Sequence, residues 1–185
     1  METVFVAGSI AITRLAPEVE QRIANLPGRG LAVVVGDADG ADSAIQAVLH
    51  ASNAQEVTVY CSGDTPRNNI GNWPVHPVYP SAARGTRAFF TAKDVEMAQI
   101  ADYGLMIWDA RSTGTLSNVI ELLARGRTSK VFVNKLKAFV TVKDVASLDA
   151  LVANMSPTAR KTAETKMRLS QRIDALRHDQ LAMPM

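Results

Sequence analysis

Short apolar runs alternate along the chain with segments in which apolar residues recur at helical spacing. Four runs are continuous rather than alternating, as in strands that are buried on both faces, namely residues 4–7, 31–35, 57–61 and 103–108. Helical spacing lies between and after these runs, at residues 17–26, 41–49, 91–100 and 116–124. This order predicts a Rossmann-like three-layer α/β/α fold with a mainly parallel sheet.

The alternation of apolar runs and helical spacing is less regular in two segments, residues 62–79 and 130–155. Residues 62–79 are rich in Gly, Pro and Asn and lack periodicity, which predicts a long loop that forms a lid or rim. The last elements of the first domain are expected to be two short strands and a helix, at residues 130–133, 139–142 and 145–155. We therefore place one domain at residues 1–155.

A charged tail follows, with Ser156 as a helix N-cap and Pro157 at the first helical position. Its thin apolar stripe consists of Leu169, Ile173 and Leu176. We expect residues 156–185 to form a helical extension that contributes to assembly without forming the ligand site. The alternative is a solvated helix that rests on its own domain.

Net charge, the numbers of Cys and His, and the lack of a long apolar run limit the classes of function that the sequence supports. The formal charge of +2 on 185 residues gives no argument for a nucleic-acid or membrane surface, so a small ligand is expected instead. The single Cys61 and the three histidines suggest neither a disulfide, a metal site nor a catalytic triad, and no cofactor is expected. An acidic residue at position 2 and the lack of a long apolar run predict a cytoplasmic protein without a membrane segment.

The most informative stretch is 102–121, where an apolar run breaks at Asp109 and passes through small residues into a helix. Ligands of open α/β sheets bind beyond the carboxyl ends of the strands, where helix N-termini attract phosphate. Hydroxyls and a carboxylate suit phosphate and ribose, so the candidate residues here are Asp109, Ser112, Thr113, Gly114, Thr115 and Asn118. The alternative is an ordinary helix start that Thr113 caps.

Two further corners end strands of the same sheet. Gly36, Asp37 and Gly40 belong to a glycine-rich turn that suits close approach to a phosphate, and we assign Asp42 mainly to helix capping. Gly8 and Ser9 end the first strand. These corners are predicted to converge on one nucleotide site. Three basic residues before the fourth strand either reach a phosphate or serve as surface charge: Arg84, Arg87 and Lys93.

With these motifs in view, residues 1–150 resemble the SLOG superfamily, which includes Lonely Guy phosphoribohydrolases and DNA-processing protein A. The resemblance rests on Gly8-Ser9, on Gly36 with Gly40-Ala41-Asp42, and on Gly114-Thr115. The run at residues 90–109 is most similar to the YpsA-like branch. The resemblance implies a Rossmann-like fold, a nucleotide or nucleoside-derivative ligand, and a homodimer or higher homo-oligomer.

One departure bears on mechanism. Lonely Guy hydrolases carry a Glu within three residues of the Gly-Thr pair, whereas this chain has Leu116, Ser117 and Asn118 there. An amide cannot act as a general base, so we expect a nucleotide-binding sensor or accessory protein.

The alternative is an enzyme acting on an N-glycosidic bond, either a phosphoribohydrolase or a deoxyribosyltransferase, with Asp109 or Glu121 as its working carboxylate. Glu121 could equally face solvent. A DNA-binding role is expected least, and nucleic acid is an unlikely partner, because the sequence lacks a basic stripe with interleaved aromatic residues.

Overall fold

The computed structural model describes residues 1–182 and contains one seven-stranded sheet. The strands are β1 (Thr3–Gly8), β2 (Ala32–Gly36), β3 (Val57–Ser62), β4 (Val75–Val78), β5 (Tyr103–Trp108), β6 (Thr128–Val133) and β7 (Ala138–Val142), in the spatial order β4-β3-β2-β1-β5-β6-β7. All neighbouring pairs are parallel except β6 with β7. The predicted mainly parallel sheet is confirmed.

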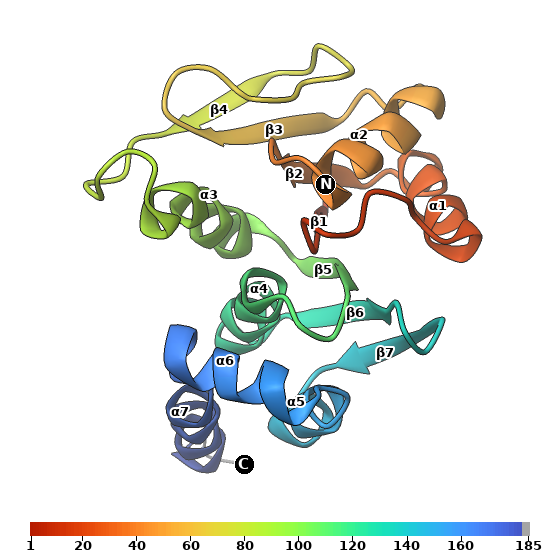
Figure 1. Ribbon diagram of the computed structural model, residues 1–185. Coiled ribbons are helices and arrows are strands. Elements are labelled where there is room, and N and C mark those ends of the chain that lie inside the picture. Colours follow the sequence, from red (N-terminus) through yellow and green to blue (C-terminus); the bar gives the residue numbers. More distant parts are fainter. Residues whose placement is uncertain (183–185) are drawn as a thin grey trace.

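Helices cover both faces of this sheet, which makes three layers (Figure 1). One face carries α1 (Pro17–Ala24) and α2 (Ala41–Ala51), and a short 3-10 turn spans Pro27–Arg29. The other carries α3 (Arg87–Ile100), α4 (Thr113–Ala124), α5 (Val145–Val152), α6 (Pro157–Met167) and α7 (Leu169–Ala182). Because strand side chains alternate between faces, Val4 and Val6 pack under α1 and α2, while Phe5 packs under the opposite helices.

The sequence pattern missed β4, which lies inside the segment expected to be a loop. Val75 of this strand pairs with Val59 of β3 in parallel register. The strand is at the edge of the sheet, mostly exposed, and contains Pro77, a residue that sheets tolerate at their edges. An exposed edge strand has little apolar periodicity, so its sequence resembles that of a loop.

Two helices begin earlier than their apolar spacing indicates. Thr86, rather than Thr91, caps α3 and accepts a hydrogen bond from Phe89 N at 3.2 Å. Ser112, rather than Thr113, caps α4 and accepts from Thr115 N at 3.3 Å. The first turn of α4 is mostly polar, and the first turn of α3 buries only Phe89, so the apolar spacing detects each helix only from its second turn.

The C-terminal extension forms two helices instead of one. They meet at Arg168, whose φ of +52° ends α6. Leu169, Ile173 and Leu176 are buried in the same core as α4 and α5, so this stripe packs on its own chain and is not open to a partner. No helix within residues 1–182 has both the length and the apolar character needed to cross a membrane.

Candidate functional site

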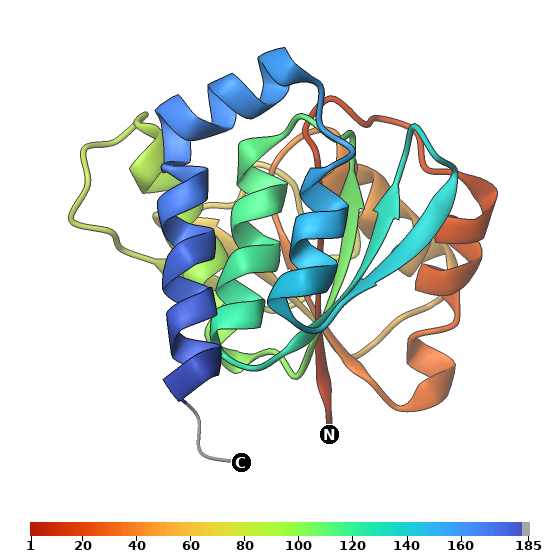
Figure 2. The same ribbon diagram turned by 90° about the horizontal axis from the view of Figure 1, so that it is seen from below.

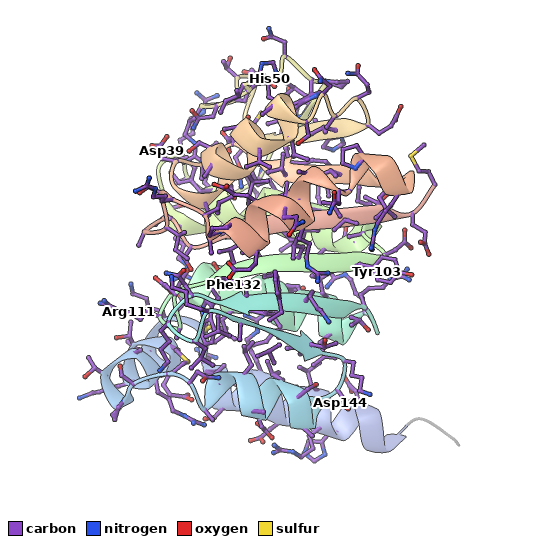
Figure 3. The ribbon with its side chains drawn as sticks, turned by 90° about the vertical axis from the view of Figure 1, so that its right-hand side faces the viewer. Asp39, His50, Tyr103, Arg111, Phe132 and Asp144 are labelled. Atoms are coloured by element: carbon purple, nitrogen blue, oxygen red, sulfur yellow. The ribbon has the colours of Figure 1, made fainter. Side chains whose placement is uncertain are left out.

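A cleft of about 850 Å³ lies at the carboxyl ends of β1, β2 and β5. The chain turns from β1 to β2 on one side and reaches β5 on the other, so this is the point where strand order reverses and α/β proteins bind ligands. Asp39 and Arg111 lie on this edge of the sheet, and Tyr103 lies on the opposite edge (Figure 3). Predicted residues that line the cleft are Gly8, Asp109, Ser112, Thr113, Gly114, Thr115 and Asn118.

The N-terminus of α4 presents backbone donors to this cleft. Asp109 Oδ1 accepts hydrogen bonds from Arg111 N at 2.9 Å and Ser112 N at 2.6 Å, which holds the preceding loop in one conformation. Within the described part of the chain, the N–H groups of Thr113 and Gly114 have no acceptor. Free N–H groups at the positive end of a helix form an anion site, and exposed Arg111 lines the same cleft.

Ser9 contacts the loop between β5 and α4 and does not line the cleft. It is fully buried, its Oγ accepts from Asp109 N at 3.1 Å, and it lies 3.3 Å from Thr115 Oγ1. The residue predicted to contact a ligand therefore connects the end of β1 to the start of α4. Its role is to position the donors that reach the cleft.

A cluster of charges with a buried centre at Asp37 and Lys93 forms part of the floor of the cleft. Lys93 Nζ is 2.9 Å from Asp94 and 3.9 Å from Asp37, and Arg67 contacts both carboxylate oxygens of Asp37 at 2.8 and 3.1 Å. Burial raises the pKa of Asp37, but the Arg67 hydrogen bonds and Lys93 outweigh it and leave the pKa below its ordinary value. Burial lowers the pKa of Lys93, and the charges of Asp94 and Asp42 reverse that shift.

Asp42 belongs to this cluster, which corrects its assignment as a helix cap. Among residues 1–182 its carboxylate makes no capping hydrogen bond to α2 and accepts one hydrogen bond, from Ala38 N at 3.3 Å. Gly36 makes room for it, because a Cβ at position 36 would lie 2.4 Å from Asp42 Oδ2 and 2.6 Å from Lys93 Nζ. Burial raises the pKa of Asp42 to about 6, with Lys93 opposing the shift.

This shift gives a pH prediction. A carboxyl whose pKa is raised on folding stabilises the fold at low pH, and that contribution is lost as the pH rises through about 6. Relative to wild type, Asp42→Asn is therefore expected to gain about 2 kcal/mol of unfolding free energy between about pH 4.5 and pH 7.5. Urea unfolding at both pH values measures this.

Asp39→Asn removes the same charge from an exposed position on the same turn and serves as the control. A constant difference between Asp42→Asn and wild type across this range would contradict the prediction.

Gly40, another predicted ligand residue, faces protein and not the cleft. Its φ is +75°, and a Cβ there would lie 2.0 Å from the Ile10 carbonyl oxygen. With Gly36 and Asp37, it builds the packing beneath the cleft and is not part of the lining. The glycine-rich turn thus allows chain segments to approach one another.

The C-terminal extension forms the roof of the cleft, contrary to the expectation that it stands apart from the site. Figure 2 shows α6 lying across the N-terminal end of α4. The residues of the extension that line the cleft are Ser156, Thr158, Ala159, Thr162 and Lys166. The sequence pattern missed them because a polar helix face over a cleft has the same composition as one in solvent.

Two apolar side chains at the cleft were also not predicted from the sequence pattern. Phe90 is 37% exposed, with the Arg67 guanidinium 4.8 Å from its ring centroid, and Ile10 is 64% exposed. Both line the cleft. An exposed aromatic ring offers a flat surface on which a nucleobase can stack. In the sequence, Phe90 is indistinguishable from a core residue of α3.

The carboxylates considered for catalysis have other partners. Glu121 does not line the cleft, and it pairs with Arg125 at 2.6 Å and Arg172 at 2.8 Å. Asp109 does line it, while one oxygen of its carboxylate holds the loop. Asn118 is 6% exposed in the cleft wall, and its amide has no hydrogen-bond partner among residues 1–182.

No protein-family model and no curated protein matches the chain. The fold is similar to that of DNA processing protein A from Helicobacter pylori, with a TM-score of 0.58 and 14% identity over 90% of this chain and 80% of that one. The same protein from Streptococcus pneumoniae gives a TM-score of 0.54 and 19% identity over 70% of this chain and 50% of that one. These proteins belong to the superfamily that the motifs resemble.

The comparison corrects one expectation. The Helicobacter pylori structure is described as having a unique single-stranded DNA binding mode, so nucleic acid cannot be set aside as an unlikely partner for this fold. Net charge was a poor guide because it averages the whole chain. The structure gathers five cations at the cleft, namely Arg67, Arg87, Lys93, Arg111 and Lys166.

Proposed function

We propose that the cleft binds a nucleotide unit, with a phosphate at the N-terminus of α4. The observation that carries the proposal is the pair of N–H groups at Thr113 and Gly114, which have no acceptor among residues 1–182. They line the cleft together with Arg111, which forms no ion pair with any described residue. Phosphate receives both hydrogen bonds and the helix dipole at such a position. Phe90 and Ile10 supply the apolar surface for the base.

A nucleotide within a single strand of DNA is the second candidate. It is favoured by the described binding mode of the Helicobacter pylori protein and by the cations around the cleft. A strand presents the same phosphate and base chemistry as a free nucleotide. Parallel titrations with nucleoside 5′-monophosphates and a short single-stranded oligonucleotide distinguish the two sources.

Binding is better supported than cleavage of an N-glycosidic bond. Asn118 stands in the cleft wall where hydrolases of the superfamily would carry a carboxylate, and an amide supplies no general base. Glu121 is neutralised by two arginines outside the cleft. A role as a sensor or accessory protein, and a place in the YpsA-like branch, follow from this proposal and from the motif at residues 90–109.

The proposal predicts that Gly114→Asp lowers nucleotide affinity by about tenfold or more, or roughly 1.4 kcal/mol, because it places a negative charge beside the bound phosphate. The fold should tolerate the change, since the nearest atom to a Cβ at this position is Ser112 Oγ at 3.9 Å. A carboxylate in the first turn also favours the helix. Isothermal titration calorimetry measures the affinity and thermal unfolding measures the stability.

Gly114→Asn is the matched control, because it has the same shape without the charge. We expect its affinity to lie much closer to that of wild type. A folded Gly114→Asp protein that binds nucleotides as tightly as wild type would exclude the N-terminus of α4 as the phosphate site.

A further inference from the structure

A side pocket of about 220 Å³ opens from the main cleft beside α7. The two hollows are adjacent and share the lining residues Arg87, Thr91, Asp94, Gly114, Asn118 and Lys166. Outside that shared set, the side pocket is also lined by Ser117 of α4 and Arg172 of α7. It is therefore built partly by the C-terminal extension and opens next to the proposed phosphate position.

The lining carries more positive charge than its own carboxylates neutralise. Within the described residues, Arg87 and Lys166 form no ion pair, although both line the pocket. Arg172 pairs with Glu121, but that carboxylate is shared with Arg125. Asp94, the other acid of the lining, is already paired with buried Lys93. An uncompensated positive charge therefore remains at the pocket.

The pKa of Arg172 also indicates an excess of positive charge at the side pocket. Burial lowers its pKa, the positive charge of Arg87 lowers it further, and the opposing charge of Glu121 does not restore it. Its guanidinium is nevertheless held in place by hydrogen bonds to Ser117 Oγ at 2.7 Å and Glu121 Oε1 at 2.8 Å. Three cations are thus brought together on α3, α6 and α7, and an anion between them would relieve their repulsion.

We propose that this side pocket binds a second phosphate group of the nucleotide whose first phosphate lies at the N-terminus of α4. The inference rests on the proposed function of the main cleft. The pocket is smaller than the roughly 300–1,000 Å³ typical of sites for whole organic ligands, but it has room for a phosphate with some water. Its lining brings three cations and two hydroxyls together with two carboxylates that are already ion-paired, and this set suits an anion better than a base. The ligand class is therefore a nucleotide with at least two phosphates.

Calorimetric titration of the full chain with nucleoside 5′-monophosphates and 5′-diphosphates of the four common bases tests this. We expect wild type to prefer a diphosphate over its monophosphate by about tenfold, as charge-assisted hydrogen bonds would give. Lys166→Gln and Arg87→Gln should each reduce that preference severalfold. Both residues are exposed, so the variants are expected to fold. Lys161→Gln removes a charge from the same helix, outside both hollows, and should keep the wild-type preference.

A 5′-phosphorylated dinucleotide shows whether the second phosphate belongs to a diphosphate or to the next unit of a strand. A preference for it that Lys166→Gln reduces would support the pocket with a strand as the source. Equal affinity for mono-, di- and dinucleotide ligands in wild type would overturn the inference and leave the proposed function intact. No binding of any nucleotide would overturn both.

Discussion

Gly40→Ala is expected to lower the free energy of unfolding by about 4 kcal/mol. Gly40 has φ +75° and ψ −124°, a backbone region that is essentially confined to glycine. Its added Cβ would also lie 2.0 Å from the Ile10 carbonyl oxygen, and backbone cannot move aside as a flexible side chain can. Urea unfolding of the variant and wild type measures the difference.

Gly30→Ala is the control for this prediction. Gly30 also has a positive φ of +68°, but a Cβ there would meet nothing within 4 Å. It should therefore cost only the left-handed backbone strain, about 1–2 kcal/mol. Similar losses for the two variants would show that the contact with Ile10 contributes nothing and would contradict the steric explanation.

Lys93→Met is expected to lower the free energy of unfolding by about 3–5 kcal/mol at neutral pH, the usual cost of leaving buried charge uncompensated. Lys93 is 3% exposed, and its removal leaves Asp42 without its only nearby cation on α3 while Asp94 loses its ion pair. Lys93 lowers the pKa of Asp42, so without Lys93 this carboxyl takes up a proton at a higher pH than in wild type. The deficit should therefore shrink as the pH falls toward about 6, and level off below it, where Asp42 is protonated in both proteins. Unfolding curves at several pH values measure it.

Two comparisons make this prediction specific. Arg87→Met on the same helix removes an exposed cation and should change stability by only about 0.5 kcal/mol. Lys93→Met combined with Asp42→Asn should recover part of the loss, because it removes one of the stranded carboxylates. A Lys93→Met protein as stable as wild type at neutral pH would show that the cluster does not stabilise the fold.

These two variants concern the floor of the proposed site. The turn at Gly40 holds the start of α2 against the segment after β1, and the cluster around Lys93 joins α2 to α3. Buried charge is costly unless its partners are fixed, so this floor is expected to be rigid. A rigid floor keeps the donors at α4 in position for an incoming phosphate.

Continuous apolar runs were sufficient to predict the central strands. Residues 4–7, 31–35, 57–61 and 103–108 fall within or next to β1, β2, β3 and β5, because strands buried on both faces have no polar positions to interrupt them. A continuous apolar run does not identify β4, because this strand is mostly exposed and contains His76 and Pro77. Periodicity also missed the largely exposed first turn of α3 and the mostly polar first turn of α4.

The candidate site was predictable where its chemistry is local. The stretch from Asp109 to Asn118 is a strand end, a cap and a helix start, all encoded within a few residues, and the structure places it in the cleft. The second turn was recognised as a glycine-rich corner, but its glycines accommodate the Asp42 carboxylate and the Ile10 backbone. A glycine that lets two distant segments of the chain pack closely has the same local sequence as a glycine that lets a ligand approach. The sequence alone therefore cannot distinguish the two roles.

By itself, the sequence determined the layered α/β architecture and the strand end and helix start at residues 109–118, because burial patterns and capping residues act over a few neighbouring positions. Only the tertiary structure decided that α6 covers the cleft, that Glu121 is held by two arginines, and that Arg87, Lys166 and Arg172 meet at one pocket. Those contacts join residues far apart in the chain. Their polar side chains would have the same sequence pattern in open solvent, so only folding distinguishes a binding surface from a solvated one.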